Sequence, residues 1–146
     1  MEKKIKKVLL ILLILFIIII LYAKFVNSIV GVHINWDVKL PYTTKILHYE
    51  RTKVGLIGDG ISYTIVKYNS SRNIKKLNNM TWEIDKNIGL ENKINEMLDR
   101  IGVESINRID FDKQYKYYVK TKNDFSALYL IYMEEEKLVY IIENIL

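Results

Sequence analysis

The chain has 146 residues, of which 50% are hydrophobic and 27% are charged, and its formal net charge is +5. It contains no cysteine, which excludes a disulfide framework, zinc sites built on cysteine and cysteine nucleophiles. The length suffices for one compact domain beside an anchor and is too short for two.

The N-terminal segment joins a basic start to a long apolar run. Four lysines within residues 1–7 precede an uncharged stretch, Val8 to Ala23, that has no Pro or Gly. A membrane helix needs about 20 apolar residues, and the run reaches that length when the ammonium group of Lys24 extends to the interface. We therefore predict a cytoplasmic basic start at 1–7 and a transmembrane helix, a signal anchor, at 8–26.

The distribution of charge predicts the orientation of this anchor. Residues 1–24 hold five lysines and one glutamate, a net charge of +4. Residues 25–146 hold thirteen lysines, four arginines and sixteen acidic residues, a net charge of +1. Because basic residues favour the cytoplasmic side, we expect the N-terminus inside and the C-terminal domain outside the cytoplasmic membrane, after a single pass. The near-neutral exported part argues against a nucleic-acid partner.

A cleaved signal peptide is the alternative reading of the same segment. It would have a shorter apolar core and a cleavage site of small residues. Val26-Asn27-Ser28 is a candidate for that site. The long apolar core favours retention of the segment as an anchor.

The exported part is expected to begin with a juxtamembrane segment at 27–43 and to fold into one domain at 44–146. Two strand patterns open this domain, at residues 44–53 and 61–68, both rich in β-branched and aromatic side chains. The glycine-rich residues 55–60 between them mark a turn. The two strands are therefore predicted to form a hairpin.

The middle of the domain changes to a helical period. Ser70 or Ser71 is suited to cap a short helix. Residues 90–101 give the clearest helix pattern, with apolar side chains on one stripe. Gly102 is a natural C-terminal stop for that helix.

The last third returns to strands, at residues 114–120, 125–133 and 137–145. Both faces of the last two strands are largely apolar, which is typical of central strands or of strands covered on both sides. Glu134–Glu136 between them indicates an exposed hairpin tip. The order ββ-αα-βββ predicts an α+β fold: one small domain with a mainly antiparallel sheet and helices packed on one face.

The glycine-rich turn is the sharpest local candidate for a site. Gly58, Asp59 and Gly60 would hold an ion through the carboxylate and the backbone. The alternating acidic ligands of a calcium loop are absent, however. The alternative is a tight turn in which Asp59-Gly60 supplies the positive-φ position.

Histidines and paired carboxylates give weaker candidates. His33 and His48 are the only histidines and have no partner at ligand spacing, so we predict no metal site and no cofactor. Asp110 and Asp112 would share one face of a strand, and paired carboxylates can do acid–base work when burial separates their pKa values. Together with Asp59 they carry an enzyme hypothesis, which the lack of a nucleophile–base pair disfavours.

Tyrosines gather in the last third of the chain and give the best candidate for an interaction surface. Tyrosine joins apolar area to a polar tip, which favours it at binding surfaces. The four candidates for contact with another envelope protein or a glycan are Tyr115, Tyr117, Tyr129 and Tyr132. The alternative is that they belong to a sheet face covered by helices.

The layout resembles that of small single-pass proteins of low-GC Gram-positive bacteria. The resemblance rests on the basic start, the apolar run and the cysteine-free α+β domain, and it carries over no functional residue. The sequence predicts a membrane-anchored extracytoplasmic protein, not an enzyme, that is a binding or structural component of a bacterial cell envelope. The alternative is a secreted or anchored ligand-binding or inhibitor module that acts through a tyrosine-rich sheet face.

Overall fold

The chain divides into two compact units, Met1–Lys39 and Leu40–Leu146. The second unit begins slightly before residue 44, where the sequence places the start of the domain. The computed structural model describes the backbone of residues 2–43, 45–52 and 60–146, and the side chains of those residues except 2–6, 8 and 19–28.

The first unit consists mainly of one long helix, α1, which spans Glu2–Trp36. The expected juxtamembrane segment, 27–43, is therefore helical as far as Trp36. The side chains of residues 9–18 are each between 48% and 60% exposed. Because ten consecutive residues cover every side of a helix, this stretch is apolar and exposed all round. Among the residues whose side chains are described, no helix is long and apolar enough to count as a membrane crossing.

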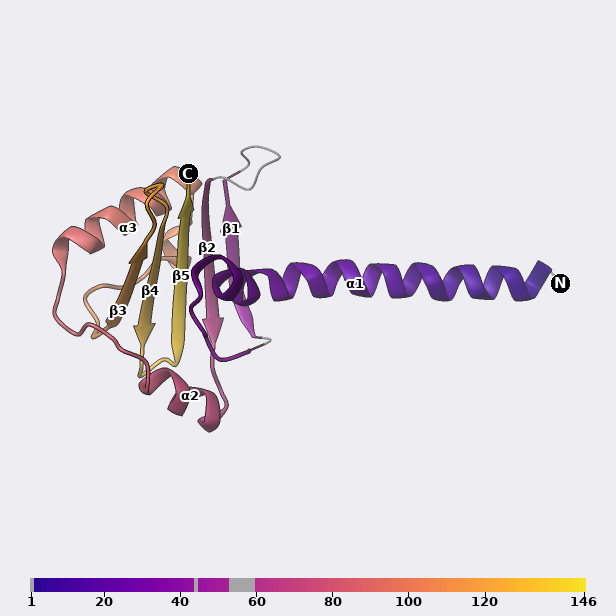
Figure 1. Cartoon of the computed structure of the whole chain (residues 1–146), viewed down its shortest axis with the longest axis horizontal. Coiled ribbons are helices and arrows are strands. Elements are labelled where there is room, and N and C mark those ends of the chain that lie inside the picture. The colour runs from indigo at the N-terminus through magenta and orange to yellow at the C-terminus, as the bar shows by residue number, and fades with distance from the viewer. Residues whose placement is uncertain (1, 44, 53–59) are drawn as a thin grey trace. The chain divides into compact units, whose positions relative to one another are not determined.

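The second unit is an α+β domain built on an antiparallel sheet (Figure 1). The described residues form five strands in the order β1-β2-β5-β4-β3, and each strand is antiparallel to its neighbours. The prediction of a mainly antiparallel sheet, with β5 and β4 inside it, is confirmed. The strands are β1 (Ile46–Arg51), β2 (Gly60–Lys67), β3 (Lys116–Thr121), β4 (Ala127–Met133) and β5 (Leu138–Ile145).

Two α-helices and one short 3₁₀ helix lie between β2 and β3, which confirms the predicted order. They are α2 (Ser71–Asn78), α3 (Ile88–Ile101) and η1 (Ser105–Asn107). The helix α3 ends where the sequence predicts, because Gly102 adopts a φ of 74° and its N–H donates to the carbonyl of Asp99.

The helix α3 covers one face of the sheet with the apolar stripe that its sequence predicts. Leu90, Ile94, Met97 and Leu98 are buried on that stripe. Alternate residues of the strands point to the same side, since side chains alternate along a strand. The strand residues that share this core are Ile61, Tyr63, Ile65, Tyr117, Ala127, Tyr129, Ile131, Met133, Tyr140 and Ile142.

The helix α2 contacts the opposite face, so the expectation that the helices pack on one face is wrong. Tyr132 projects from that face, and its hydroxyl lies 3.1 Å from Oδ1 of Asn78 in α2. The ring of Trp82, just beyond α2, lies 5.4 Å from the ring of Tyr132. Because β4 is apolar on both faces, both of them need cover.

The turn between β4 and β5 carries the acidic tip that the sequence indicates. Two of its three carboxylates are paired with lysines near the start of β3. Nζ of Lys116 lies 2.5 Å from Oε2 of Glu134, and Nζ of Lys113 lies 2.9 Å from Oε1 of Glu136. The turn is thus tied to the strand next to β4.

Candidate functional site

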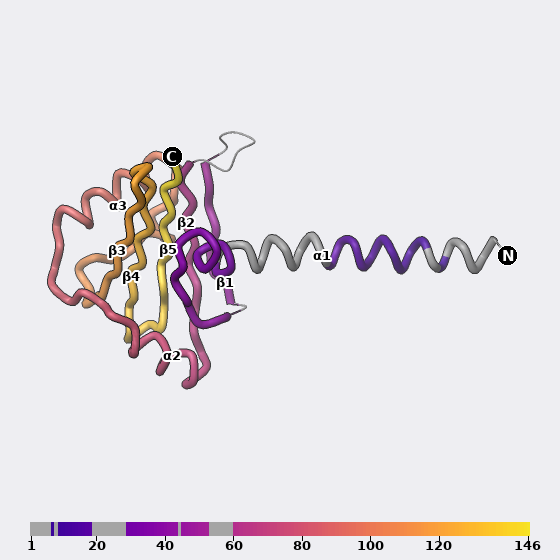
Figure 2. Tube along the Cα trace, viewed as in Figure 1, coloured from indigo at the N-terminus to yellow at the C-terminus, as the bar shows by residue number. Residues whose placement is uncertain are grey.

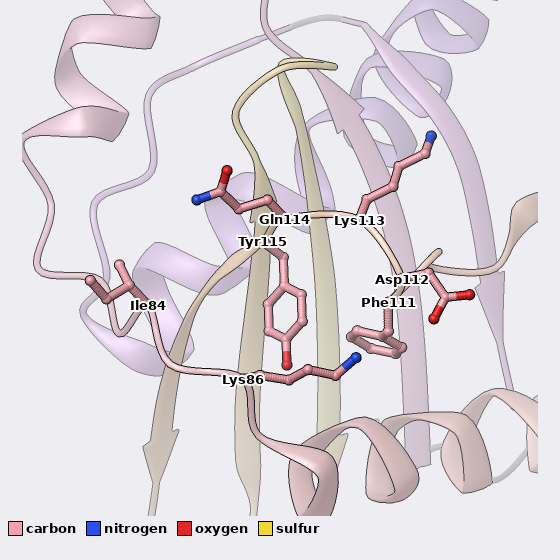
Figure 3. A pocket seen from close by; sticks show the side chains of 7 residues that line it. All are labelled: Ile84, Lys86, Phe111, Asp112, Lys113, Gln114 and Tyr115. Atoms are coloured by element: carbon pink, nitrogen blue, oxygen red, sulfur yellow. The ribbon is translucent and has the colours of Figure 1, made fainter.

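The described residues line an open pocket of about 300 Å³ where the segment before α3 meets the turn before β3 (Figure 3). Tyr115 lies at its centre, with Phe111 beside it and Ile84 on the other side. The rings of Phe111 and Tyr115 meet edge to face, with their centroids 5.3 Å apart. The complete lining is Ile84, Lys86, Phe111, Asp112, Lys113, Gln114 and Tyr115.

Backbone pairing positions the first wall of this pocket. The segment between α2 and α3 runs beside β3 (Figure 2). Glu83 and Tyr117 exchange two backbone hydrogen bonds, at 2.8 Å and 2.9 Å. Asn87 then caps α3, because its Oδ1 accepts the N–H of Leu90 at 3.0 Å. The residues between these two points, Ile84 among them, are held over the start of β3.

A hydrogen-bond network fixes the hydroxyl of Tyr115, which lines the pocket. This hydroxyl donates to Oε1 of Glu91 at 2.7 Å and accepts the backbone N–H of Asn87 at 3.1 Å. Nζ of Lys86 lies 4.0 Å from the same Glu91 oxygen. Burial raises the pKa of Tyr115 to about 12, helped by Glu91 and opposed by the N–H of Asn87. Tyr115 is therefore a neutral hydrogen-bonding group at ordinary pH.

The rim of the pocket mixes both signs of charge. Lys113 pairs with Glu136 at 2.9 Å and lies 3.9 Å from Asp110. The hydrogen bond to Glu136 is the main reason why the pKa of Lys113 is raised. Asp112 and Lys86 supply one more charge of each sign. Such a site offers apolar contacts inside and polar contacts around them.

The four candidate tyrosines lie in the core, so they do not form an exposed interaction face. Tyr115, Tyr117, Tyr129 and Tyr132 are all buried. Tyr117 and Tyr129 face α3, whereas Tyr132 faces the other side of the sheet. The alternative reading from the sequence, a sheet face covered by helices, describes Tyr117 and Tyr129. Only Tyr115 also lines the pocket.

The paired aspartates lie in a turn and not in a strand. Oδ1 of Asp110 accepts the backbone N–H of Asp112 at 3.2 Å, and both side chains are exposed. Neither carboxyl is buried, so burial does not separate the environments of the two side chains. Asp112 lines the pocket and Asp110 does not.

The histidines lie apart from the pocket. His33 is exposed in the last turn of α1. The ring of His48 packs edge to face on Tyr63 at 5.8 Å. No group of three or more histidine, aspartate or glutamate side chains is placed to hold a metal ion within the described residues.

Most of the candidate ion loop lies outside the described residues, including Gly58 and Asp59. Gly60 is described and has a φ of 119°. A side chain at this position would overlap Oγ1 of Thr52. That oxygen accepts the N–H of Ile61 at 3.1 Å. Gly60 thus has a structural role, as the residue that lets Thr52 close the end of β1 on β2.

No pattern in the sequence marks the remaining pocket residues, such as Ile84 and Lys86. They lie in an irregular segment, where no periodicity marks a face. The one sequence feature that points to this pocket is Phe111, an aromatic residue within a turn between two aspartates.

Neither a known protein family, nor a curated protein, nor a solved structure matches the chain.

Proposed function

We propose that the chain is a single-pass, membrane-anchored extracytoplasmic protein whose α+β domain is a binding component of a bacterial cell envelope. The observation that carries the proposal is the uncharged run Val8 to Ala23 behind a basic start. The exposed apolar side chains of residues 9–18 support it, because lipid would cover them. The helix α1 also continues without a break through Val26–Ser28, which favours retention over cleavage.

Protease protection tests the location and orientation. The full chain is produced in a Gram-positive bacterium, and proteinase is added to intact protoplasts. We expect residues beyond the membrane to be degraded and a short N-terminal fragment to remain, while a cytoplasmic control protein stays intact. Survival of the full chain in closed protoplasts would contradict the orientation. A mature mass without the first 28 residues would contradict the anchor.

We further propose that the domain binds through the pocket around Tyr115 rather than through a tyrosine-rich sheet face. Ile84 at its edge is 72% exposed, although it is apolar. A pocket that combines apolar lining with a few polar groups is the arrangement expected of a binding site. The partner is an envelope protein or a glycan, and we expect no turnover of substrate.

Site-specific crosslinking tests this binding site. A photo-crosslinking amino acid replaces Ile84 in one variant of the full chain and Lys76 of α2 in another. Both positions are exposed, but α2 contacts the opposite face of the sheet. In living cells we expect a defined adduct from position 84 and none from position 76. Equal patterns from the two positions would contradict the proposal.

A further inference from the structure

The turn between β3 and β4 presents a phenylalanine in an unfavourable backbone conformation. The N–H of Lys122 donates to the carbonyl of Ser126 at 2.9 Å, and the N–H of Phe125 donates to the carbonyl of Lys122 at 3.1 Å. Phe125 has a φ of 64°. A three-residue hairpin loop of this kind places its last residue in the left-handed region, where Gly is preferred.

The side chain of Phe125 contributes little stability to the fold that would offset the strain of its backbone. It is 83% exposed, so it removes almost no apolar area from water. The turn itself is held by other groups, since Oδ1 of Asp124 accepts the N–H of Ser126 at 2.9 Å. A strained, exposed aromatic residue in a turn secured by its neighbours points to a contact outside the domain.

A second exposed apolar side chain lies next to this turn. The N–H of Leu146 donates to Oγ of Ser126 at 3.1 Å, and Leu146 is 64% exposed. Figure 1 shows the end of β5 and the β3–β4 turn at the same end of the sheet. Lys120 and Lys122 belong to the same hairpin. The tip therefore combines an exposed aromatic ring with an exposed aliphatic side chain, and its loop carries the carboxylate of Asp124 as well as the ammonium group of Lys122.

We propose that this tip, Phe125 with Leu146, contacts the interfacial region of the lipid bilayer in which the chain is anchored. The inference rests on the proposed membrane anchor. Phenylalanine and leucine side chains are favoured at the boundary between the headgroups and the acyl chains of a bilayer. The tip is a protruding turn and not a groove, which fits a lipid surface. One aromatic contact is weak from bulk solution, but the anchor makes it an intramolecular contact at high effective concentration.

Fluorescent labelling tests the contact with the full chain in vesicles of phosphatidylcholine and phosphatidylglycerol. Because the chain has no cysteine, Phe125→Cys gives a single labelling site. Lys137→Cys is the matched control, since Lys137 has a φ of 58° in the β4–β5 turn at the opposite end of the sheet. With an environment-sensitive dye, we expect a blue shift and quenching by nitroxide-labelled lipid at position 125, and neither effect at position 137.

A second pair of variants keeps the test independent of the label at position 125. The dye is attached to Asn123→Cys, with Phe125 or with Phe125→Gly. Glycine suits the positive φ, so we expect Phe125→Gly to leave the stability of the fold unchanged or to raise it. We expect lipid to shield the dye at position 123 when Phe125 is present, and the dye to show an aqueous emission in the Phe125→Gly variant. Lipid quenching at 123 that does not depend on Phe125 would overturn the role of the ring.

Two further outcomes separate this inference from the proposed function. If the protein floats with the vesicles and the dye at 125 stays aqueous, the lipid contact is overturned and the anchor stands. The same holds if the dye at 125 is shielded only when an envelope protein is added. If the protein does not float with the vesicles, the anchor fails and this inference fails with it.

Discussion

At the scale of single residues, Tyr115 and Tyr129 show that the same type of side chain has two different roles in one core. The hydroxyl of Tyr115 has a carboxylate acceptor and a backbone donor. The hydroxyl of Tyr129 is buried and has no hydrogen-bond partner among the described residues. Nζ of Lys93 lies 5.6 Å from the centre of its ring. Tyr129 therefore contributes through its ring and not through its hydroxyl.

This difference predicts opposite results for the same substitution. Tyr129→Phe removes an unsatisfied buried hydroxyl, so we expect unchanged stability or a gain of up to about 1 kcal/mol. Tyr115→Phe leaves Glu91 without its donor, so we expect a loss of about 1–3 kcal/mol. Urea unfolding of the full chain in detergent micelles, followed by near-UV circular dichroism, measures both. A larger loss for Tyr129→Phe than for Tyr115→Phe would contradict the assignment.

At the scale of elements, the two α-helices of the domain are capped differently. Asn87 caps α3 through its side chain, and its Nδ2 also lies 3.3 Å from the hydroxyl of Tyr117. Ser70 precedes α2 and makes no side-chain cap bond among the described residues. Ser70 therefore occupies the N-cap position of α2, but no described group of the helix receives a capping bond from its side chain.

We expect alanine at these two caps to have unequal effects. Asn87→Ala should cost about 0.5–2 kcal/mol, because it removes a cap bond and frees the segment that walls the pocket. Ser70→Ala is the matched control and should change stability by less than about 0.5 kcal/mol. The same unfolding measurement compares them. Equal losses would show that the cap bond of Asn87 has no special weight.

At the scale of the whole molecule, the buried tyrosines tie stability to alkaline pH. Burial raises the pKa of Tyr63, Tyr68, Tyr132 and Tyr140 above the ordinary value, and it raises that of Tyr115 to about 12. The folded state thus holds these protons more tightly than the unfolded state does. Their stabilising contribution is complete below pH about 10, the ordinary pKa of tyrosine, and is lost as the pH rises through the folded-state values.

We therefore expect the domain to unfold cooperatively above pH about 10. For each strongly buried tyrosine that stays protonated in the folded state, the free energy of unfolding falls by up to about 1.4 kcal/mol per pH unit in that range. Absorbance of tyrosinate near the ultraviolet edge and circular dichroism should change together between pH 10 and 12. Gradual ionisation with an unchanged fold up to pH 12 would contradict the burial of these rings.

Local patterns in the sequence were enough to predict the elements of the domain. The stripe of α3 and the stop at Gly102 follow from helical periodicity and from the conformational freedom of glycine. The apolar faces of β4 and β5 follow from their composition and indicate that both are interior strands. The antiparallel pairing of β1 with β2 and of β4 with β5 could be predicted because short connections favour antiparallel neighbours.

Tertiary structure decided which side chains face each other, and with that the candidate site. The sequence by itself determined the apolar N-terminal run, the α+β class and the order of strands and helices, since these depend on neighbours along the chain. It could not determine that α2 contacts Tyr132, or that Ile84 and Tyr115 line one pocket, because these pairs come from distant segments. Nor could it place Phe125 at a positive φ, which depends on the register between β3 and β4. Periodicity marks which face of an element is apolar, and only the packed fold selects what covers that face.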